Sequence, residues 1–357
     1  MENINLLTQN LLSAAIRAGS SDIHLVADSY PILRTMGKLA SLQEGGKLDS
    51  ETVMAMITSL MTPNQKELFL NNLEVDFSVS IPGKARFRGN AYFQKRTPSL
   101  SLRFIPDKVP TIEELKLPSI CHSFAKLKQG FILVTGPAGV GKSTTLASII
   151  GEINSSRSEH IVTIEDPIEF VHDNKKSIVS QREIGGDTKS WTNALKSVLR
   201  QDPDIVYIGE MRDAETIQAA MTVAETGHLV FATLHTNSAS QSIERIVDSF
   251  SEEQQSQVVL QLSMVLEAVL SQRLIPTLDG KQVVATEILI ATPAVKNNIR
   301  EGKTFQIDNV IQTSGNLGMK LIENSLAELV NANVIDRATA LEYSIRPSLL
   351  DKLLGRR

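Results

Sequence analysis

The sequence contains a single cysteine, Cys121, in 357 residues. One thiol can build neither a disulfide framework nor a four-cysteine zinc site, so both of these structural devices are excluded. The scarcity of cysteine favours a reducing compartment.

Long apolar runs are missing as well. No stretch reaches the roughly 20 apolar residues that a membrane-spanning helix needs. Near the start of the chain, Leu7, Leu11, Leu12 and Ile16 follow helical spacing, and no basic segment precedes them. This pattern is typical of an amphipathic helix packed on a core, not of a signal peptide. We therefore predict a cytoplasmic protein.

The chain has no strong excess of either charge: its formal net charge is −4 and its pI is near 5.9. It therefore has no global basic field to hold nucleic acid, although a local basic groove stays open, and we expect no nucleic-acid partner. With 42% hydrophobic and 21% charged residues, the composition is that of a folded globular protein.

The first part of the chain, residues 1–106, mixes helix and strand signals. A helix is expected over Leu6–Ala18, and another over "SETVMAMITSLM" with Ser50 as its N-cap. Further on, apolar and polar residues alternate around Pro82-Gly83, which predicts two strands joined by a turn. These signals predict a small α+β domain.

Prolines bracket the next segment, "DKVPTIEELKLP", which we interpret as a linker over residues 107–118. From residue 119 to 357, short apolar runs such as "FILVT", "HIVTIED", "IVYIGE" and "HLVFATLH" alternate with helical segments. Strands buried on both faces have this composition, so the sequence predicts an α/β domain with a mainly parallel sheet. From about Pro293 the pattern is helical throughout.

The segment "GPAGVGKST" follows a predicted strand and opens a predicted helix. Its G-x-x-x-x-G-K-S/T spacing lets backbone N–H groups turn inward around phosphates at a helix N-terminus. Lys142 would reach the β- and γ-phosphates of ATP, and the Ser143 hydroxyl would take a Mg²⁺ position. The predicted nucleotide-binding residues are Gly136, Pro137, Ala138, Gly139, Val140, Gly141, Lys142, Ser143 and Thr144.

Acidic residues close two of the predicted strands. "VTIEDPIEF" carries Glu165, Asp166 and Glu169, and "IVYIGEMRD" carries Glu210 and Asp213. Ligands of parallel α/β sheets bind beyond the carboxyl ends of the strands, so both clusters should face the side of the phosphate loop. Carboxylates there can hold Mg²⁺ or activate the attacking water. For Asp213 we favour helix capping, and for Glu210 catalysis.

An aspartate usually ends the strand that helps to hold magnesium, but here Gly209 occupies that place and Glu210 follows it. The chain either has a disabled site or draws its acids from two strand ends, and "VTIEDPIEF" favours the second interpretation.

Two histidines, His228 and His235, stand at opposite ends of one predicted strand. At a rise of about 3.3 Å per residue they would be about 23 Å apart and cannot share a metal. His235 would lie on the phosphate side and His228 at the far end. Spacing alone favours structural roles for both, although His235 could sense the γ-phosphate.

Four arginines, Arg86, Arg88, Arg96 and Arg103, lie on or between two predicted strands of the first domain. Alone they indicate a solvated face. They would gain a role in catalysis if this face met the nucleotide of a neighbouring subunit.

Several segments together resemble the secretion ATPase superfamily of type II and type IV pilus systems, and within it the ATPases that retract type IV pili. They are "GSSDIHL", "ARFRGNAYFQKR", "GPAGVGKSTT", "IEDPIEFVH", "ALKSVLRQDPDI", "GEMRD", "AETGHLVFATLHT", "VLSQRLIP" and "AVKNNIREGK". The last resembles a retraction motif, A-I-R-N-L-I-R-E, but departs from it at Val295, Lys296 and Asn298.

The resemblance implies a PAS-like N-terminal domain, a RecA-like P-loop ATPase domain and a homohexameric ring. It implies ATP and Mg²⁺ as ligands, an inner-membrane platform protein as partner, and a place at the inner face of the bacterial inner membrane. A paralogous retraction ATPase is a further possible partner.

Residue by residue, the resemblance implies Glu169 as general base and Glu210 as a magnesium group. Arg88 and Arg103 match the positions that act on a neighbour's nucleotide. His235 would take part in hydrolysis and His228 in nucleotide binding. Two alternatives stay open within the superfamily: an accessory retraction ATPase, and an ATPase of pilus assembly or type II secretion.

Overall fold

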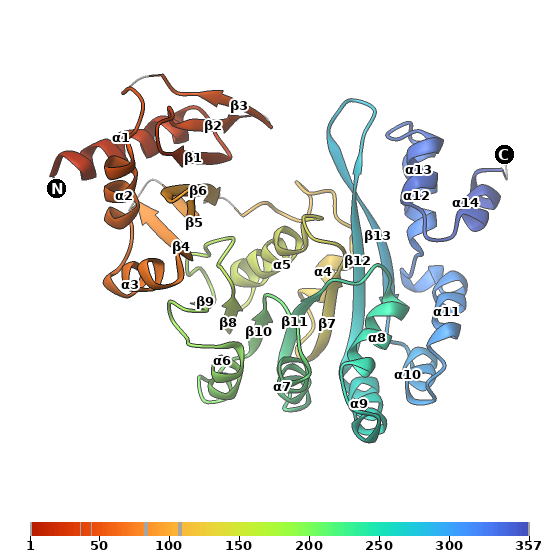
Figure 1. Cartoon of the computed structure of the whole chain (residues 1–357). Coiled ribbons are helices and arrows are strands. Elements are labelled where there is room, and N and C mark those ends of the chain that lie inside the picture. The colour runs from red at the N-terminus through yellow and green to blue at the C-terminus, as the bar shows by residue number, and fades with distance from the viewer. Residues whose placement is uncertain (1, 36, 44, 82–84, 106–108, 356–357) are drawn as a thin grey trace. The chain divides into compact units, whose positions relative to one another are not determined.

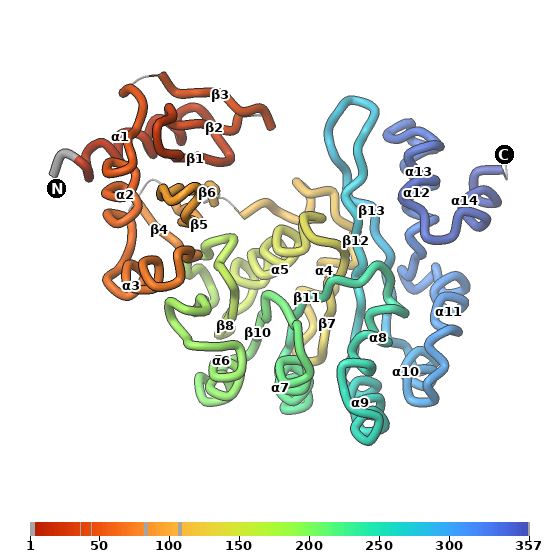
Figure 2. Tube along the Cα trace, in the orientation of Figure 1, coloured from red at the N-terminus to blue at the C-terminus, as the bar shows by residue number. Residues whose placement is uncertain are grey.

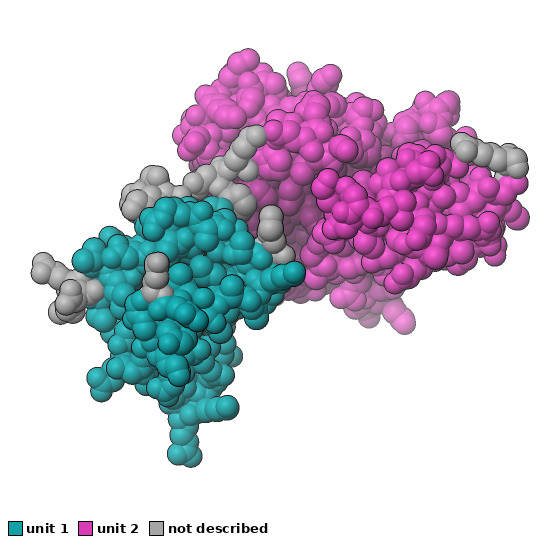
Figure 3. All heavy atoms as spheres, turned by 90° about the horizontal axis from the view of Figure 1, so that it is seen from above, with its two compact units in different colours: residues 1–108 teal, residues 109–357 magenta. Residues whose placement is uncertain are grey.

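The structure is a computed structural model that describes residues 2–35, 37–43, 45–81, 85–105 and 109–355. The predicted turn at Pro82-Gly83 and the first two residues of the predicted linker lie outside these ranges. The chain divides into two compact units, residues 1–108 and 109–357 (Figure 3).

The described residues of unit 1 form a six-stranded antiparallel sheet with three helices, in the strand order β3-β2-β1-β6-β5-β4. Helix α2 packs on β1 and β6, and α1 packs on α2, around a core that includes Leu12, Met56 and Phe87. The helices are α1 (Glu2–Arg17), α2 (Ser50–Ser59) and α3 (Pro63–Asn72). The strands are β1 (Asp22–Val26), β2 (Ile32–Thr35), β3 (Lys38–Ser41), β4 (Glu74–Ile81), β5 (Ala85–Gln94) and β6 (Thr97–Ile105).

One predicted helix cap in unit 1 is wrong. Ser50 is the first residue of α2, and Asp49 is the N-cap, whose Oδ1 accepts the Thr52 N–H at 2.7 Å. A carboxylate in this place both pairs a free N–H group and suits the positive end of the helix dipole.

Unit 2 is built on a seven-stranded sheet in the order β13-β12-β7-β11-β10-β8-β9, parallel except for β13 (Figure 1). The strands are β7 (Gly130–Thr135), β8 (His160–Glu165), β9 (Ile178–Glu183), β10 (Ile205–Ile208), β11 (Leu229–Leu234), β12 (Leu266–Pro276) and β13 (Gln282–Ile290). The predicted α/β class with a mainly parallel sheet is confirmed.

Helices cover both faces of this sheet, because its central strands are apolar on both. One face packs on α4 (Ile120–Phe124) and α5 (Lys142–Ser156). The other packs on α6 (Trp191–Val198), α7 (Ala214–Glu225), α8 (Ala239–Asp248) and α9 (Glu252–Val265). In β10 the alternation is simple: Val206 and Ile208 face the α6–α9 side, whereas Ile205 and Tyr207 face the α5 side.

The C-terminal helices lie beside the β12–β13 hairpin, as the blue end of the tube shows (Figure 2). They are α10 (Pro293–Arg300), α11 (Ile307–Thr313), α12 (Ile322–Asn331), α13 (Arg337–Tyr343) and α14 (Pro347–Leu354), with short 3-10 turns at Thr304–Gln306 and Gly315–Leu317. Ile275 and Ala285 of the hairpin share a small core with Leu326, Ala340 and Leu350 of these helices.

The structure differs from the prediction at the linker. Residues 109–118 belong to unit 2, because Ile112 and Leu117 are buried against α4 and α5. No helix in the described ranges is long and apolar enough to cross a membrane.

Candidate nucleotide site

The phosphate loop joins β7 to α5 and opens with Gly136, whose φ is +142°. A Cβ at this position would lie 2.3 Å from the Gln272 carbonyl oxygen, so only glycine fits. Gly141 caps α5 at φ +86°, again in the left-handed region that favours glycine. The loop therefore presents the N-terminus of a 15-residue helix to the carboxyl side of the sheet, a geometry that favours phosphate.

Lys142 is the first residue of α5, and its side chain is buried although it is charged. Its Nζ donates to the carbonyl oxygens of Gly136 (2.7 Å) and Pro137 (2.9 Å) and lies 3.4 Å from His235 Nδ1. Burial lowers its pKa, while the charges of nearby acids, Glu210 first, oppose that shift. The ammonium group is thus held within the loop and next to an acid of another strand.

Glu210 stands at the centre of the candidate site. Its Oε1 lies 3.2 Å from His235 Nε2, and its Oε2 lies 2.9 Å from Arg212 Nη2. His235 in turn faces Lys142, so the histidine lies between the phosphate-loop lysine and the glutamate. The structure thus brings Lys142 of the phosphate loop, Glu210 and His235 together.

The acidic cluster after β8 contains two very different carboxyl groups. Glu169 is exposed, whereas Glu165 is only 5% exposed at the end of β8. Thr163 Oγ1 (2.6 Å) and Gln181 Nε2 (3.1 Å) donate to Glu165 Oε1, and the Glu169 backbone N–H also bonds to this carboxyl group. Burial raises the pKa of Glu165 to about 7 despite these bonds. Nothing in the sequence alone marks Glu165 as buried or separates its role from that of Glu169.

Tyr207 is a second residue that sequence reasoning missed. It lies on β10, faces the α5 side of the sheet, and its phenol forms a hydrogen bond with the Ser143 side chain. Burial raises its pKa, and the nearby charges of Glu165 and Glu169 add to the effect. The neutral phenol therefore supports the hydroxyl that we expect to take a magnesium position.

Gly209 occupies the place where a magnesium aspartate was expected, and packing explains it. A Cβ there would lie 3.3 Å from both Glu165 Cα and the Ile164 carbonyl oxygen, and 3.4 Å from the Trp191 ring. Any larger side chain would press on the neighbouring strand β8. Asp213, further along, is the N-cap of α7 and accepts the Thr216 N–H at 2.8 Å, as predicted.

His228 does not join the phosphate loop within the chain. It precedes β11, and its carbonyl oxygen accepts a hydrogen bond from the Gly130 N–H at the start of β7, at the end of the sheet opposite the loop. Its Nδ1 lies 3.0 Å from both the Val223 carbonyl oxygen and Thr226 Oγ1. The expected role in nucleotide binding thus has no support within one subunit, whereas the structural interpretation fits these contacts.

The arginines lie in unit 1, where Arg88 of β5 is directly opposite Arg103 of β6. Both are exposed, and Arg103 Nε donates to Asp22 Oδ1 at 2.9 Å. Burial alone would raise the pKa of Asp22. The hydrogen bonds from Arg103 and Ser21 have the larger combined effect, so the pKa lies below its usual range. The two guanidinium groups form one exposed basic face of unit 1.

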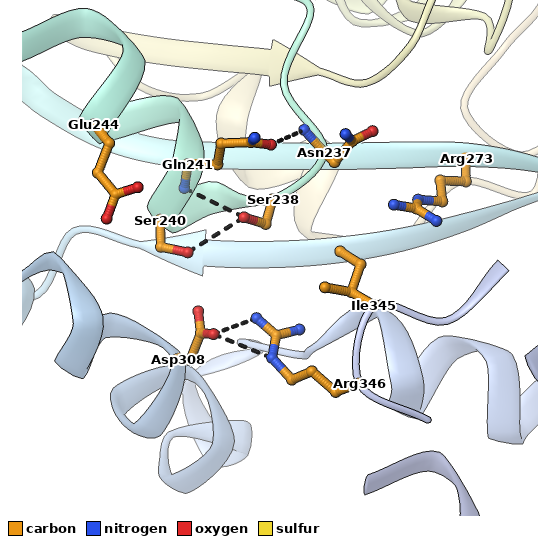
Figure 4. A pocket seen from close by; sticks show the side chains of 9 residues that line it. All are labelled: Asn237, Ser238, Ser240, Gln241, Glu244, Arg273, Asp308, Ile345 and Arg346. Carbon is orange, nitrogen blue, oxygen red and sulfur yellow. Dashed lines mark hydrogen bonds and ion pairs between the residues drawn. The ribbon is translucent and has the colours of Figure 1, made fainter. Parts of the chain in front are cut away.

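A polar pocket of about 480 Å³ lies between α8, β12 and the C-terminal helices. Arg273 lines one side, and on the other Arg346 pairs with Asp308 (Figure 4). Arg346 also forms ion pairs with Glu287 (3.4 Å) and Glu323 (3.1 Å), which are fully buried. Carboxylates of the same unit therefore neutralise the charge of Arg346. This pocket is not formed by the phosphate loop.

Lys296 occupies an arginine position of the motif noted above, on α10. Its Nζ lies 2.8 Å from Glu267 Oε1 at the start of β12, so the charge of the position is retained in an ion pair.

The residues around the loop fit a magnesium nucleotide. Mg²⁺ is usually bound by one or two protein groups together with substrate phosphates and water. Ser143 and Glu210 would supply those protein groups, and the buried ammonium of Lys142 the positive charge that phosphate oxygens require.

Comparison with known proteins covers most of the chain. The family described as Type II/IV secretion system protein matches residues 2–338. The type IV pilus retraction ATPase PilT of Pseudomonas aeruginosa is 46% identical over 337 residues, covering 94% of this chain and 98% of that protein. A twitching motility protein of Neisseria gonorrhoeae is 48% identical over 326 residues, covering 91% and 87%.

A solved structure agrees. The crystal structure of the pilus retraction motor PilT with bound ADP superposes with a TM-score of 0.90 at 42% identity, covering 96% of this chain and 98% of that one. The chain therefore belongs to the family of type II/IV secretion system ATPases, within which it is similar to PilT.

Proposed function

We propose that this protein is a hexameric motor that hydrolyses ATP to ADP and phosphate and uses the energy to retract type IV pili. The observation that carries the proposal is the meeting of Lys142, His235 and Glu210 beside the phosphate loop. The similarity to PilT over nearly the whole chain supports retraction in particular.

In the proposed reaction the loop N–H groups and Lys142 bind the phosphates, and Ser143 and Glu210 hold Mg²⁺. The ion would neutralise charge on the phosphates. Glu169, exposed next to buried Glu165, is the proposed base that takes a proton from the attacking water. His235 links Lys142 to Glu210 and could register the loss of the terminal phosphate.

Arg88 and Arg103 complete the proposed site from a neighbouring subunit. An arginine supplied in trans stabilises the charge that develops on the transferred phosphoryl group. Their exposure, side by side on unit 1, supports this role, and turnover would then depend on ring assembly. A homohexamer that acts on a platform protein at the inner face of the bacterial inner membrane completes the proposal.

The enzymatic part is tested with Lys142→Ala in the purified full chain. Loss of nucleotide binding and phosphate release supports the site, whereas wild-type rates contradict it. The exposed Lys128→Ala, outside the loop, is the matched control and should behave as wild type.

The mechanical direction is tested with a strain that lacks the gene. Retraction predicts excess surface pili and lost twitching, and a strain without pili would instead indicate assembly. Low turnover by the isolated protein would favour an accessory ATPase that acts through another ring.

A further inference from the structure

Gln272 of β12 lies directly beside the start of the phosphate loop, although it is far from the loop in sequence. Strand β12 pairs with β7 in parallel, and the last paired residues are Ser271 and Thr135. Gln272 is therefore level with Gly136, the first residue of the loop. The close approach of its carbonyl oxygen to Gly136 follows from this register.

The Gln272 side chain then reaches over the loop. It is 1% exposed, its Nε2 donates to the Val140 carbonyl oxygen at 2.6 Å, and its Oε1 accepts from Thr145 Oγ1 at 3.0 Å. Because a carbonyl oxygen can only accept, the amide NH₂ must face Val140, and the arrangement of the carboxamide is fixed. One residue thus connects the middle of the loop to the first turn of α5.

We propose that Gln272 is a positioning residue that holds the phosphate loop in the shape that binds nucleotide; this inference rests on the proposed function. The C=O and N–H groups of a trans peptide unit point in opposite directions. A bond that holds the Val140 C=O toward β12 therefore turns the Gly141 N–H away from β12. Gly141 N–H is then aligned by Gln272 before any phosphate arrives.

The next residue on the strand points the other way. Arg273 Nη1 donates to the Tyr343 carbonyl oxygen of the C-terminal helices at 2.6 Å and lines the pocket of Figure 4. Adjacent residues of one strand therefore hold the phosphate loop on one side and the C-terminal helices on the other.

The test measures the affinity of the purified full chain for a fluorescent ADP analogue. Gln272→Ala leaves the Val140 carbonyl oxygen buried and unpaired, and we expect about 10- to 100-fold weaker binding. Gln272→Glu keeps the shape and the acceptor for Thr145 but loses the donor, so it should weaken binding to a similar extent. If Gln272→Ala does not fold, Gln272→Glu tests the bond to the Val140 carbonyl oxygen, and Thr145→Val tests the bond from the Thr145 hydroxyl. Thr145→Ser keeps a hydroxyl at this position and should therefore bind nucleotide like the wild type.

Gln261 provides the matched control. It is also a buried glutamine of unit 2 with both ends of its amide paired, but its partners are Gln218 (2.8 Å) and Glu225 (2.6 Å) of α7. Gln261→Ala should keep the wild-type affinity. Hydrogen exchange of the segment 136–145 should rise in Gln272→Ala and not in Gln261→Ala.

The outcomes separate the inference from the proposed function. Folded Gln272→Ala with wild-type affinity overturns the inference, provided that Lys142→Ala has lost binding. Equal losses in Gln272→Ala and Gln261→Ala also overturn it, because the effect would then be general destabilisation. Wild-type binding in Lys142→Ala would refute the nucleotide site itself.

Discussion

The buried carboxyl group of Glu165 should make the stability of unit 2 depend on pH. Glu165→Gln replaces it by a group of the same shape that does not ionise. The amide oxygen can still accept from Thr163 and Gln181, which both donate to the same oxygen in the wild type. The substitution therefore removes the titration and leaves the packing in place.

The magnitude follows from the pKa of Glu165, which burial raises from 4.5 to about 7 in the folded protein. A shift of this size corresponds to about 3 kcal/mol. Because the folded pKa is raised, the stability contributed by the protonated form is fully present below pH 4.5 and is lost as the pH rises to about 7. Glu165→Gln does not titrate. Its free energy of unfolding, relative to that of the wild type, should therefore rise by roughly 2 to 3 kcal/mol between pH 5 and pH 8.

Urea unfolding at the two pH values measures this difference. The single tryptophan of the chain, Trp191, begins α6 next to Gly209 and reports on unit 2 by its fluorescence. The exposed Glu253→Gln on α9 is the control and should show no such widening. An advantage of Glu165→Gln that is the same at pH 5 and pH 8 would refute the reasoning.

Three further predictions concern the site. Tyr207→Phe removes the hydrogen bond to Ser143, so it should raise the Mg²⁺ concentration for half-maximal nucleotide binding about 5-fold. In a Ser143→Ala background the same substitution should have no effect. Arg103→Ala should lower hydrolysis without preventing hexamer formation, and mixing with Lys142→Ala subunits should restore part of the activity; wild-type turnover in Arg103→Ala would contradict completion in trans. Gly209→Asp, although it restores the expected aspartate, should lower the melting temperature in a thermal scan because its Cβ meets strand β8.

The phosphate loop and the central strands could be predicted because their signals are local. Glycine spacing, Lys142 and the apolar runs are read from consecutive residues, and parallel strands place the loop, Glu210 and His235 at one edge of the sheet. The order of the strands was not predicted from the sequence.

Glu165 and Gln272 could not be assigned in this way, because their environments come from distant segments. Strand β9 pairs with β8 and brings Gln181 into a hydrogen bond with Glu165, and the sequence does not predict β9 as a strand. Gln272 reaches Val140 only because the β12–β13 hairpin, also missed, lies next to β7. Packing between strands far apart in the sequence decides both.

A similar limit applies at the helix starts. Ser50 and Asp49 are both good N-cap residues, and the choice depends on which residue has the extended backbone; Asp49 does, with φ −76° and ψ 170°. For His228 and His235, by contrast, the direction of the predicted strand is enough to place His235 on the phosphate side and His228 at the far end, and the register of β11 with β7 agrees.

The most direct measurement of the central claim is steady-state phosphate release from ATP by the purified full chain and by Glu210→Ala. Glu215→Ala is the matched control, since Glu215 lies nearby in the first turn of α7 but is exposed and pairs with Lys196. A site centred on Glu210 predicts turnover in the wild type and the control, and a loss of about 100-fold or more in Glu210→Ala. Equal turnover in all three proteins would contradict it.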